Sequence, residues 1–151
     1  MKMYSKRNSK AGFTLVELMV VAVIVAVLAA VAIPLMSANV TRAMATEAEA
    51  ALGTARSNLR AMYAETKDYS KDSEGNSTAG AMIRAVGGVP GFSSGDLNGT
   101  YFSDACYTVT STASNYTLTA TGSASTAPKK DKVAGVVITL NQDGEFTRTG
   151  L

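Results

Sequence analysis

The 151-residue sequence lacks histidine and tryptophan and has a single cysteine, Cys106. Without histidine the chain can form no Ser-His-Asp triad and no histidine metal site, and it has none of the usual side chains that titrate near neutral pH. A single cysteine excludes an intrachain disulfide and any Cys-x-x-Cys metal or redox site. These absences argue against most hydrolases and metalloenzymes. We expect Cys106 to be a small buried residue.

Charged residues are also scarce, at 17% of the chain, where soluble globular domains average about 25%. Four of the 14 basic residues lie before residue 13 with no acid among them, so residues 13–151 keep 10 basic residues against 12 acidic ones. This part of the chain has a formal charge of −2 and no overall field that would attract nucleic acid. The charge pattern therefore does not predict a nucleic-acid partner.

A long apolar run extends from Phe13 to Met36, and Glu17 is its only charged residue. The run has the ~20 residues that a helix needs to cross the hydrocarbon core of a bilayer. The basic stretch before it puts the amino terminus in the cytoplasm by the positive-inside rule. An ordinary signal peptide, cut so that the mature chain begins at Ile33, and an uncleaved anchor are both open. Neither explains a carboxylate at position 17, which is costly inside an apolar run.

Residues 10–18 read KAGFTLVEL, and this segment resembles the class III signal of type IV pilins and type II secretion pseudopilins. In that family a prepilin peptidase cuts after the glycine and methylates the new amino terminus. The resemblance implies a leader over residues 1–12, cleavage between Gly12 and Phe13, and N-methylation of Phe13. It puts Glu17 at the fifth mature position and Pro34 at position 22, where pilins commonly have proline.

Elementary electrostatics supports the role that the resemblance gives Glu17. Cleavage would create an ammonium group at Phe13, and in a filament the Glu17 carboxylate of an incoming subunit could pair with that group on its neighbour. Because an unpaired charge in an apolar core is strongly disfavoured, such a pair would fix the register of the subunits more than it would add stability. A glutamate that simply reaches the water at the membrane edge is the alternative.

The helical pattern continues to residue 66. Apolar side chains from Met36 to Tyr63 recur every three or four positions, which predicts an amphipathic helix. Gly53 marks a bend or a close approach. We also expect Pro34 to kink or locally melt the helix near residues 30–34, because proline removes a backbone donor and clashes with the preceding turn. A polar surface loop should follow over residues 66–78, and then a short helix over residues 79–86.

The last third of the chain is rich in β-forming residues. Alternating apolar and threonine positions predict strands over residues 101–110, 116–121, 133–140 and 145–148, with a turn at residues 141–144. We predict an α+β fold in which a long amino-terminal helix packs on a carboxy-terminal antiparallel sheet of three or four strands, the pilin fold. The periplasmic head would span residues 37–151, with its helix over 37–66, a loop over 67–99 and the sheet over 100–151.

Two groups of charged residues in the head are candidate binding sites. Lys129, Lys130 and Lys132 are the only basic cluster after the leader, but an acid interrupts them and we expect no aromatic side chain beside them, so a solvated loop is predicted. Asp143 and Glu145 share a turn, but two acids are too few ligands for calcium. No catalytic constellation appears. We therefore expect no metal, no cofactor and no enzymatic activity.

The resemblance implies a structural subunit that polymerises with itself into a surface filament serving adhesion, motility or DNA uptake. Its expected partners are the prepilin peptidase, the inner-membrane pilus assembly platform and, before assembly, the inner membrane with the amino terminus in the cytoplasm. The filament itself would lie outside the cell. A type II secretion pseudopilin in a short periplasmic pseudopilus is one alternative. A secreted, non-enzymatic binding module with an ordinary signal peptide is another.

Overall fold

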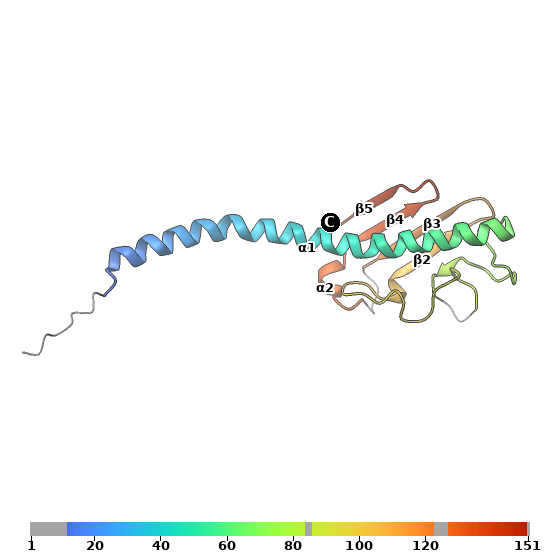
Figure 1. Ribbon diagram of the computed structural model, residues 1–151, viewed down its shortest axis with the longest axis horizontal. Coiled ribbons are helices and arrows are strands. Elements are labelled where there is room, and N and C mark those ends of the chain that lie inside the picture. Colours follow the sequence, from blue (N-terminus) through green and yellow to red (C-terminus); the bar gives the residue numbers. More distant parts are fainter. Residues whose placement is uncertain (1–11, 84–85, 123–126, 151) are drawn as a thin grey trace, which may run out of the picture. The chain divides into compact units, whose positions relative to one another are not determined.

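The computed structural model of the protein describes residues 12–83, 86–122 and 127–150. The chain divides into two units, residues 1–39 and residues 40–151. The longest element, helix α1 (Leu15–Thr66), begins in the first unit and ends in the second (Figure 1). The predicted leader lies outside the described residues, except for Gly12.

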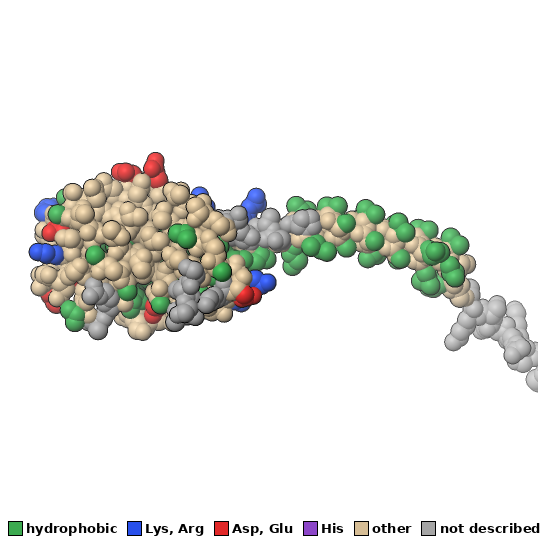
Figure 2. Space-filling view, turned by 180° about the vertical axis from the view of Figure 1, so that it is seen from behind, with side chains coloured by type: hydrophobic (Ala, Val, Ile, Leu, Met, Phe, Trp, Pro, Cys, Tyr) green, Lys and Arg blue, Asp and Glu red, His purple; other side chains and the backbone are tan. Residues whose placement is uncertain are grey.

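The first unit consists of the apolar part of α1 and the residues before it. Over Leu15–Ile33 the helix is long and apolar enough to cross a membrane, and its large hydrophobic side chains are all exposed (Figure 2). An apolar surface of this extent marks a site that lipid or another protein covers. The helix runs without interruption through residues 30–34, so the local melting expected there is not observed. A kink at Pro34 stays a prediction.

The second unit, which we call the head, contains one antiparallel sheet. Its strands follow one another in chain order: β1 (Gly80–Ala81), β2 (Tyr107–Ser111), β3 (Tyr116–Thr121), β4 (Val137–Asn141) and β5 (Phe146–Thr149). A 3-10 turn, η1 (Asp104–Cys106), precedes β2, and a short helix, α2 (Lys130–Val133), precedes β4. The α+β fold class is confirmed, with five strands where three or four were predicted.

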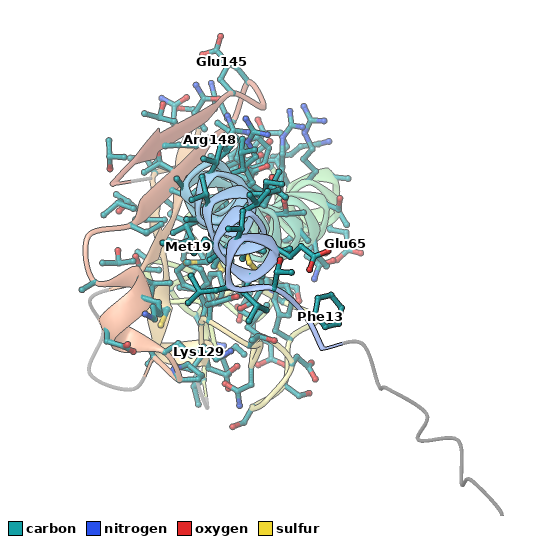
Figure 3. All side chains as sticks on the ribbon, turned by 90° about the vertical axis from the view of Figure 1, so that its left-hand side faces the viewer. Phe13, Met19, Glu65, Lys129, Glu145 and Arg148 are labelled. Carbon is teal, nitrogen blue, oxygen red and sulfur yellow. The ribbon has the colours of Figure 1, made fainter. Side chains whose placement is uncertain are left out.

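The core lies between α1 and the inner face of the sheet. The predicted helical stripe is buried from Met44 onward, and Figure 3 shows the helix along one side of the sheet. Burying one leucine side chain in such a core contributes roughly 2 kcal/mol. The buried residues of the helix are Met44, Ala45, Ala48, Leu52, Ala55, Leu59 and Met62, and those of the strands are Tyr107, Val109, Tyr116, Leu118, Ala120, Ile138 and Leu140.

The predicted helix over residues 79–86 is wrong. Gly80–Ala81 form strand β1, which pairs with β2, and Ile83 bridges to Gly88. Glycine sets this outcome, because Gly80 and Gly88 both have positive φ values, 113° and 85°, that a right-handed helix does not contain. The free edge of β2 then supplies the backbone partners that a helix would have supplied internally.

The predicted strand over residues 133–140 begins late. Val133 ends helix α2, and β4 starts only at Val137. The reason is a close approach of two chain segments: the Gly122 N–H donates to the Val136 carbonyl at 2.9 Å. A Cβ on Gly122 would stand 2.0 Å from the Val133 carbonyl oxygen. The lysine cluster, predicted as a loop, therefore takes part in a helical turn.

Candidate processing and assembly site

The predicted cleavage site lies immediately before α1. Gly12, Phe13 and Thr14 are not helical, and the helix begins at Leu15. All three residues are exposed, and the Phe13 side chain is 83% exposed. The Gly12–Phe13 peptide bond is thus outside regular structure, where a peptidase can bind the chain in an extended form.

Thr14 and Glu17 close the start of the helix with reciprocal hydrogen bonds. The Thr14 backbone N–H and hydroxyl both donate to Glu17 Oε2, at 2.9 and 2.8 Å, and the Glu17 N–H donates to Thr14 Oγ1 at 3.2 Å. This is a capping box, in which two of the unpaired N–H groups of a helix start receive partners. The Thr-x-x-Glu spacing in the sequence is itself the signature of this motif.

The capping box uses one oxygen of Glu17 and leaves the other. Both bonds from Thr14 end on Oε2, and among the described residues Oε1 has no hydrogen-bond partner. A carboxylate offers about four acceptor positions on its two oxygens. A negative charge in the first turn also interacts favourably with the positive end of the helix dipole. Glu17 therefore stabilises its own helix and retains an oxygen for a second partner.

Comparison with protein families identifies the same segment. Residues 7–33 match the family model of the prokaryotic N-terminal methylation motif. Over this segment the chain is similar to type IV pilins and pseudopilins, and we call it pilin-like. Proteins with this motif are generally structural rather than enzymatic. No curated protein sequence and no solved structure matches the pilin-like chain. The motif and the exposed apolar helix together fit anchoring in a membrane.

The lysine cluster of the head differs from the expectation in one contact. Lys129 Nζ lies 4.9 Å from the centre of the Tyr101 ring, so an aromatic side chain does accompany these lysines. The distance is typical of a cation–π interaction, which links the start of α2 to the loop before β2. Lys132 stands 4.0 Å from the carboxylate of Asp131, and both side chains are largely exposed. A pair of this kind contributes little.

The other candidate residues of the head make hydrogen bonds within the fold. Cys106 is buried, as predicted, and its Sγ accepts the Ser103 N–H at 3.4 Å. Glu145 accepts a hydrogen bond from the Asn141 amide and donates its backbone N–H to the same side chain. Within the described ranges, no group of three or more acidic, histidine or cysteine side chains is arranged to hold a metal ion.

Sequence reasoning missed the role of Glu47. This half-buried α1 residue accepts three backbone N–H groups, from Thr100 on Oε2 and from Tyr101 and Phe102 on Oε1, each at 2.9 Å. One carboxylate thus holds the loop before β2 against the helix. Nothing local in the sequence predicts the contact, because the partners are more than fifty residues apart.

Proposed function

We propose that this pilin-like chain is the structural subunit of a type IV pilus. The observation that carries the proposal is the combination, in one segment, of the methylation motif with an exposed apolar helix that starts just after the expected cleavage site. A prepilin peptidase would cut between Gly12 and Phe13 and methylate Phe13. The apolar helices of many copies would then leave the inner membrane and pack together through the assembly platform, with the heads outside the cell.

In the proposed filament, Glu17 sets the register of the subunits. Cleavage turns the Phe13 nitrogen into an ammonium group, and burial among apolar helices makes an unpaired charge costly. Glu17 Oε1, which the capping box leaves unused, is the acceptor for that ammonium on a neighbouring copy. The alternative is that Glu17 only caps its own helix.

Two substitutions at Glu17 separate these roles. Glu17→Gln keeps an oxygen for the capping box, which accepts glutamine as well as glutamate, but removes the charge. Glu17→Ala removes both. We expect both variants to insert into the membrane normally and both to reduce the yield of sheared filaments, measured against total chain. If Glu17→Gln assembles like the parent chain, the charge pair has no role and the cap alone matters.

The first test is the intact mass and amino-terminal sequence of the chain from sheared surface filaments and from membranes. We expect a terminus at methylated Phe13. A terminus at Ile33 would indicate an ordinary signal peptide and a secreted binding module, and an intact Met1 would indicate an uncleaved anchor. A short pseudopilus of a secretion system would use the same processing, so abundance in the sheared fraction distinguishes the pilus from that alternative.

A further inference from the structure

The chain contains four Asn-x-Ser/Thr sequences, which begin at Asn39, Asn76, Asn98 and Asn115. None has proline at the middle position. This tripeptide is the acceptor of N-linked glycosylation, which requires both an accessible side-chain amide and the hydroxyl two residues later. The four sites differ sharply in how the structure presents these two groups.

Asn98 presents both groups on the surface. Asn98, Gly99 and Thr100 are all exposed and lie outside any helix or strand. Asn98 Oδ1 accepts the Asp104 N–H at 3.0 Å, which fixes the amide so that its Nδ2 faces the other way. Among the described residues, neither Asn98 Nδ2 nor the Thr100 hydroxyl has a hydrogen-bond partner.

The loop that carries Asn98 is held firmly from beneath. Glu47 accepts the N–H of Thr100, and the Asp104 carboxylate accepts those of Gly95 and Leu97 at 2.6 and 3.1 Å. Leu97 itself is buried in the core. The acceptor amide is thus displayed on a fixed support.

Asn76 is blocked at both ends. Its Nδ2 donates to the carboxylates of Asp72 and Glu74, at 3.1 and 3.3 Å. The hydroxyl of Thr78, two residues later, is fully buried and hydrogen-bonded to the Tyr69 carbonyl at 2.5 Å. An enzyme would have to unfold this loop to reach either group.

Asn39 lies within regular structure, and Asn115 directly precedes it. Asn39 lies inside helix α1. Asn115 is exposed, but the next residue, Tyr116, is buried, and Thr117 belongs to strand β3, which is paired on both sides. These segments cannot bend into an active site without losing their backbone hydrogen bonds.

Asn98 also has an exposed acid two positions before it. Asp96 uses Oδ2 to accept the Ser93 N–H at 2.7 Å, which fixes its carboxylate beside the acceptor. Such a carboxylate offers a transferase a charge to recognise, since arginine binds carboxylates with strong, directional hydrogen bonds. Asn115 and Asn39 have alanine and serine at the corresponding position, and Asn76 has Glu74, which accepts a hydrogen bond from the Asn76 amide itself.

We propose that Asn98 is an acceptor of an N-linked oligosaccharide from a lipid-pyrophosphate donor. Asn98 Nδ2 forms a bond to the anomeric carbon of the first sugar, and the bond from that carbon to the pyrophosphate oxygen breaks. The lipid pyrophosphate leaves with the electron pair, and the amide loses one proton to a base of the transferase. The inference rests on the proposed function for its topology, which puts the head on the side of the membrane away from the cytoplasm.

The test expresses the full chain in a bacterium that carries a lipid-linked oligosaccharide and an oligosaccharyltransferase, with an acceptor peptide appended after Leu151 as an internal control. Peptide mass spectrometry then shows whether each asparagine-containing peptide carries the mass of an oligosaccharide. We expect the peptide with Asn98 to gain the mass of one oligosaccharide. Asn98→Gln and Thr100→Ala should abolish the gain, and Thr100→Ser should retain it. Asn76→Gln and Asn115→Gln should leave it unchanged.

A modified appended peptide with an unmodified Asn98 would overturn the proposal, as would a gain of mass that survives Asn98→Gln. Thr100→Ala guards against a folding defect, because it leaves the Asn98–Asp104 bond in place. The amino-terminal peptide from the same sample tests the pilus proposal separately. A chain that begins at Phe13 but has an unmodified Asn98 overturns the glycosylation proposal and leaves the pilus proposal standing. An unmodified appended peptide overturns the placement of the head on the side of the membrane away from the cytoplasm, and the glycosylation proposal with it.

Discussion

Replacing Glu47 by glutamine should destabilise the head by about 2 kcal/mol. A net hydrogen bond to a charged group contributes roughly 1.5–3 kcal/mol, against about 1 for a neutral one. Glutamine can still present one oxygen to Tyr101 and Phe102, but its amide NH₂ would face the Thr100 N–H, so a donor meets a donor. The variant therefore loses one charge-assisted bond outright and weakens two others.

Thermal unfolding of the full chain in detergent micelles measures this loss. Five of the six tyrosines lie in the head, so the near-ultraviolet circular dichroism signal reports mainly on head packing. For a unit of about this size, 2 kcal/mol corresponds to a midpoint lower by roughly 8 °C. Glu47→Ala removes all three bonds and should lower the midpoint further, because three bonds at the low end of that range correspond to a loss of about 4.5 kcal/mol.

Glu65→Gln is the matched control. Glu65 lies on the same helix, is exposed and points away from the sheet (Figure 3), so its substitution should change the free energy of unfolding by less than about 0.5 kcal/mol. If Glu47→Gln unfolds at the same temperature as Glu65→Gln, the three contacts contribute nothing net, and the carboxylate is better described as a solvated group.

Three further predictions concern the head and use the same unfolding assay. Leu52→Ala leaves a cavity in the core and should lower the free energy of unfolding by about 3 kcal/mol. A loss no larger than that of an alanine substitution at an exposed position would refute the packing. Gly53→Ala should raise the midpoint, because a Cβ there meets nothing within 4 Å and alanine favours helix by about 1 kcal/mol, whereas Gly122→Ala should lower it strongly through its clash with the Val133 carbonyl. Burial above all, followed by the charge of Glu47, raises the pKa of Tyr107 far above its usual value. The stability that this shift contributes is complete below about pH 10, where the unfolded chain begins to ionise, and is lost as the pH rises further. Tyr107→Phe should therefore lose less stability than the parent chain between about pH 10 and pH 12.

The parts of the fold that the sequence predicts are those encoded by local periodicity. The α1 stripe repeats every three or four residues over several turns, and β2 and β3 alternate threonine with apolar residues, so each face is defined without reference to the rest of the chain. Thr108, Thr119, Thr139 and Thr147 even lie directly opposite one another across four strands.

The parts that the sequence does not predict depend on distant partners. β1 is two residues long and exists because the edge of β2 is free. Val133 has a high β-propensity but ends α2, because Gly122 brings another segment against it. The hydrogen bonds to the Glu47 carboxylate join residues over fifty positions apart. Propensity is a weak prior in each case, and tertiary contacts override it.

The amino-terminal motif is different, because a local and an intermolecular explanation apply to the same four residues. Thr14 and Glu17 form a capping box that would start a helix in any protein, so the presence of glutamate at this position does not by itself require a partner chain. The intermolecular role rests on the second oxygen. In the proposed filament, the bonds from Thr14 to Oε2 would already restrict the Glu17 side chain, so that pairing Oε1 with an ammonium costs less side-chain entropy than ordering a free glutamate. Cap and pair would then reinforce one another, and only a variant that keeps the cap while losing the charge, Glu17→Gln, separates them.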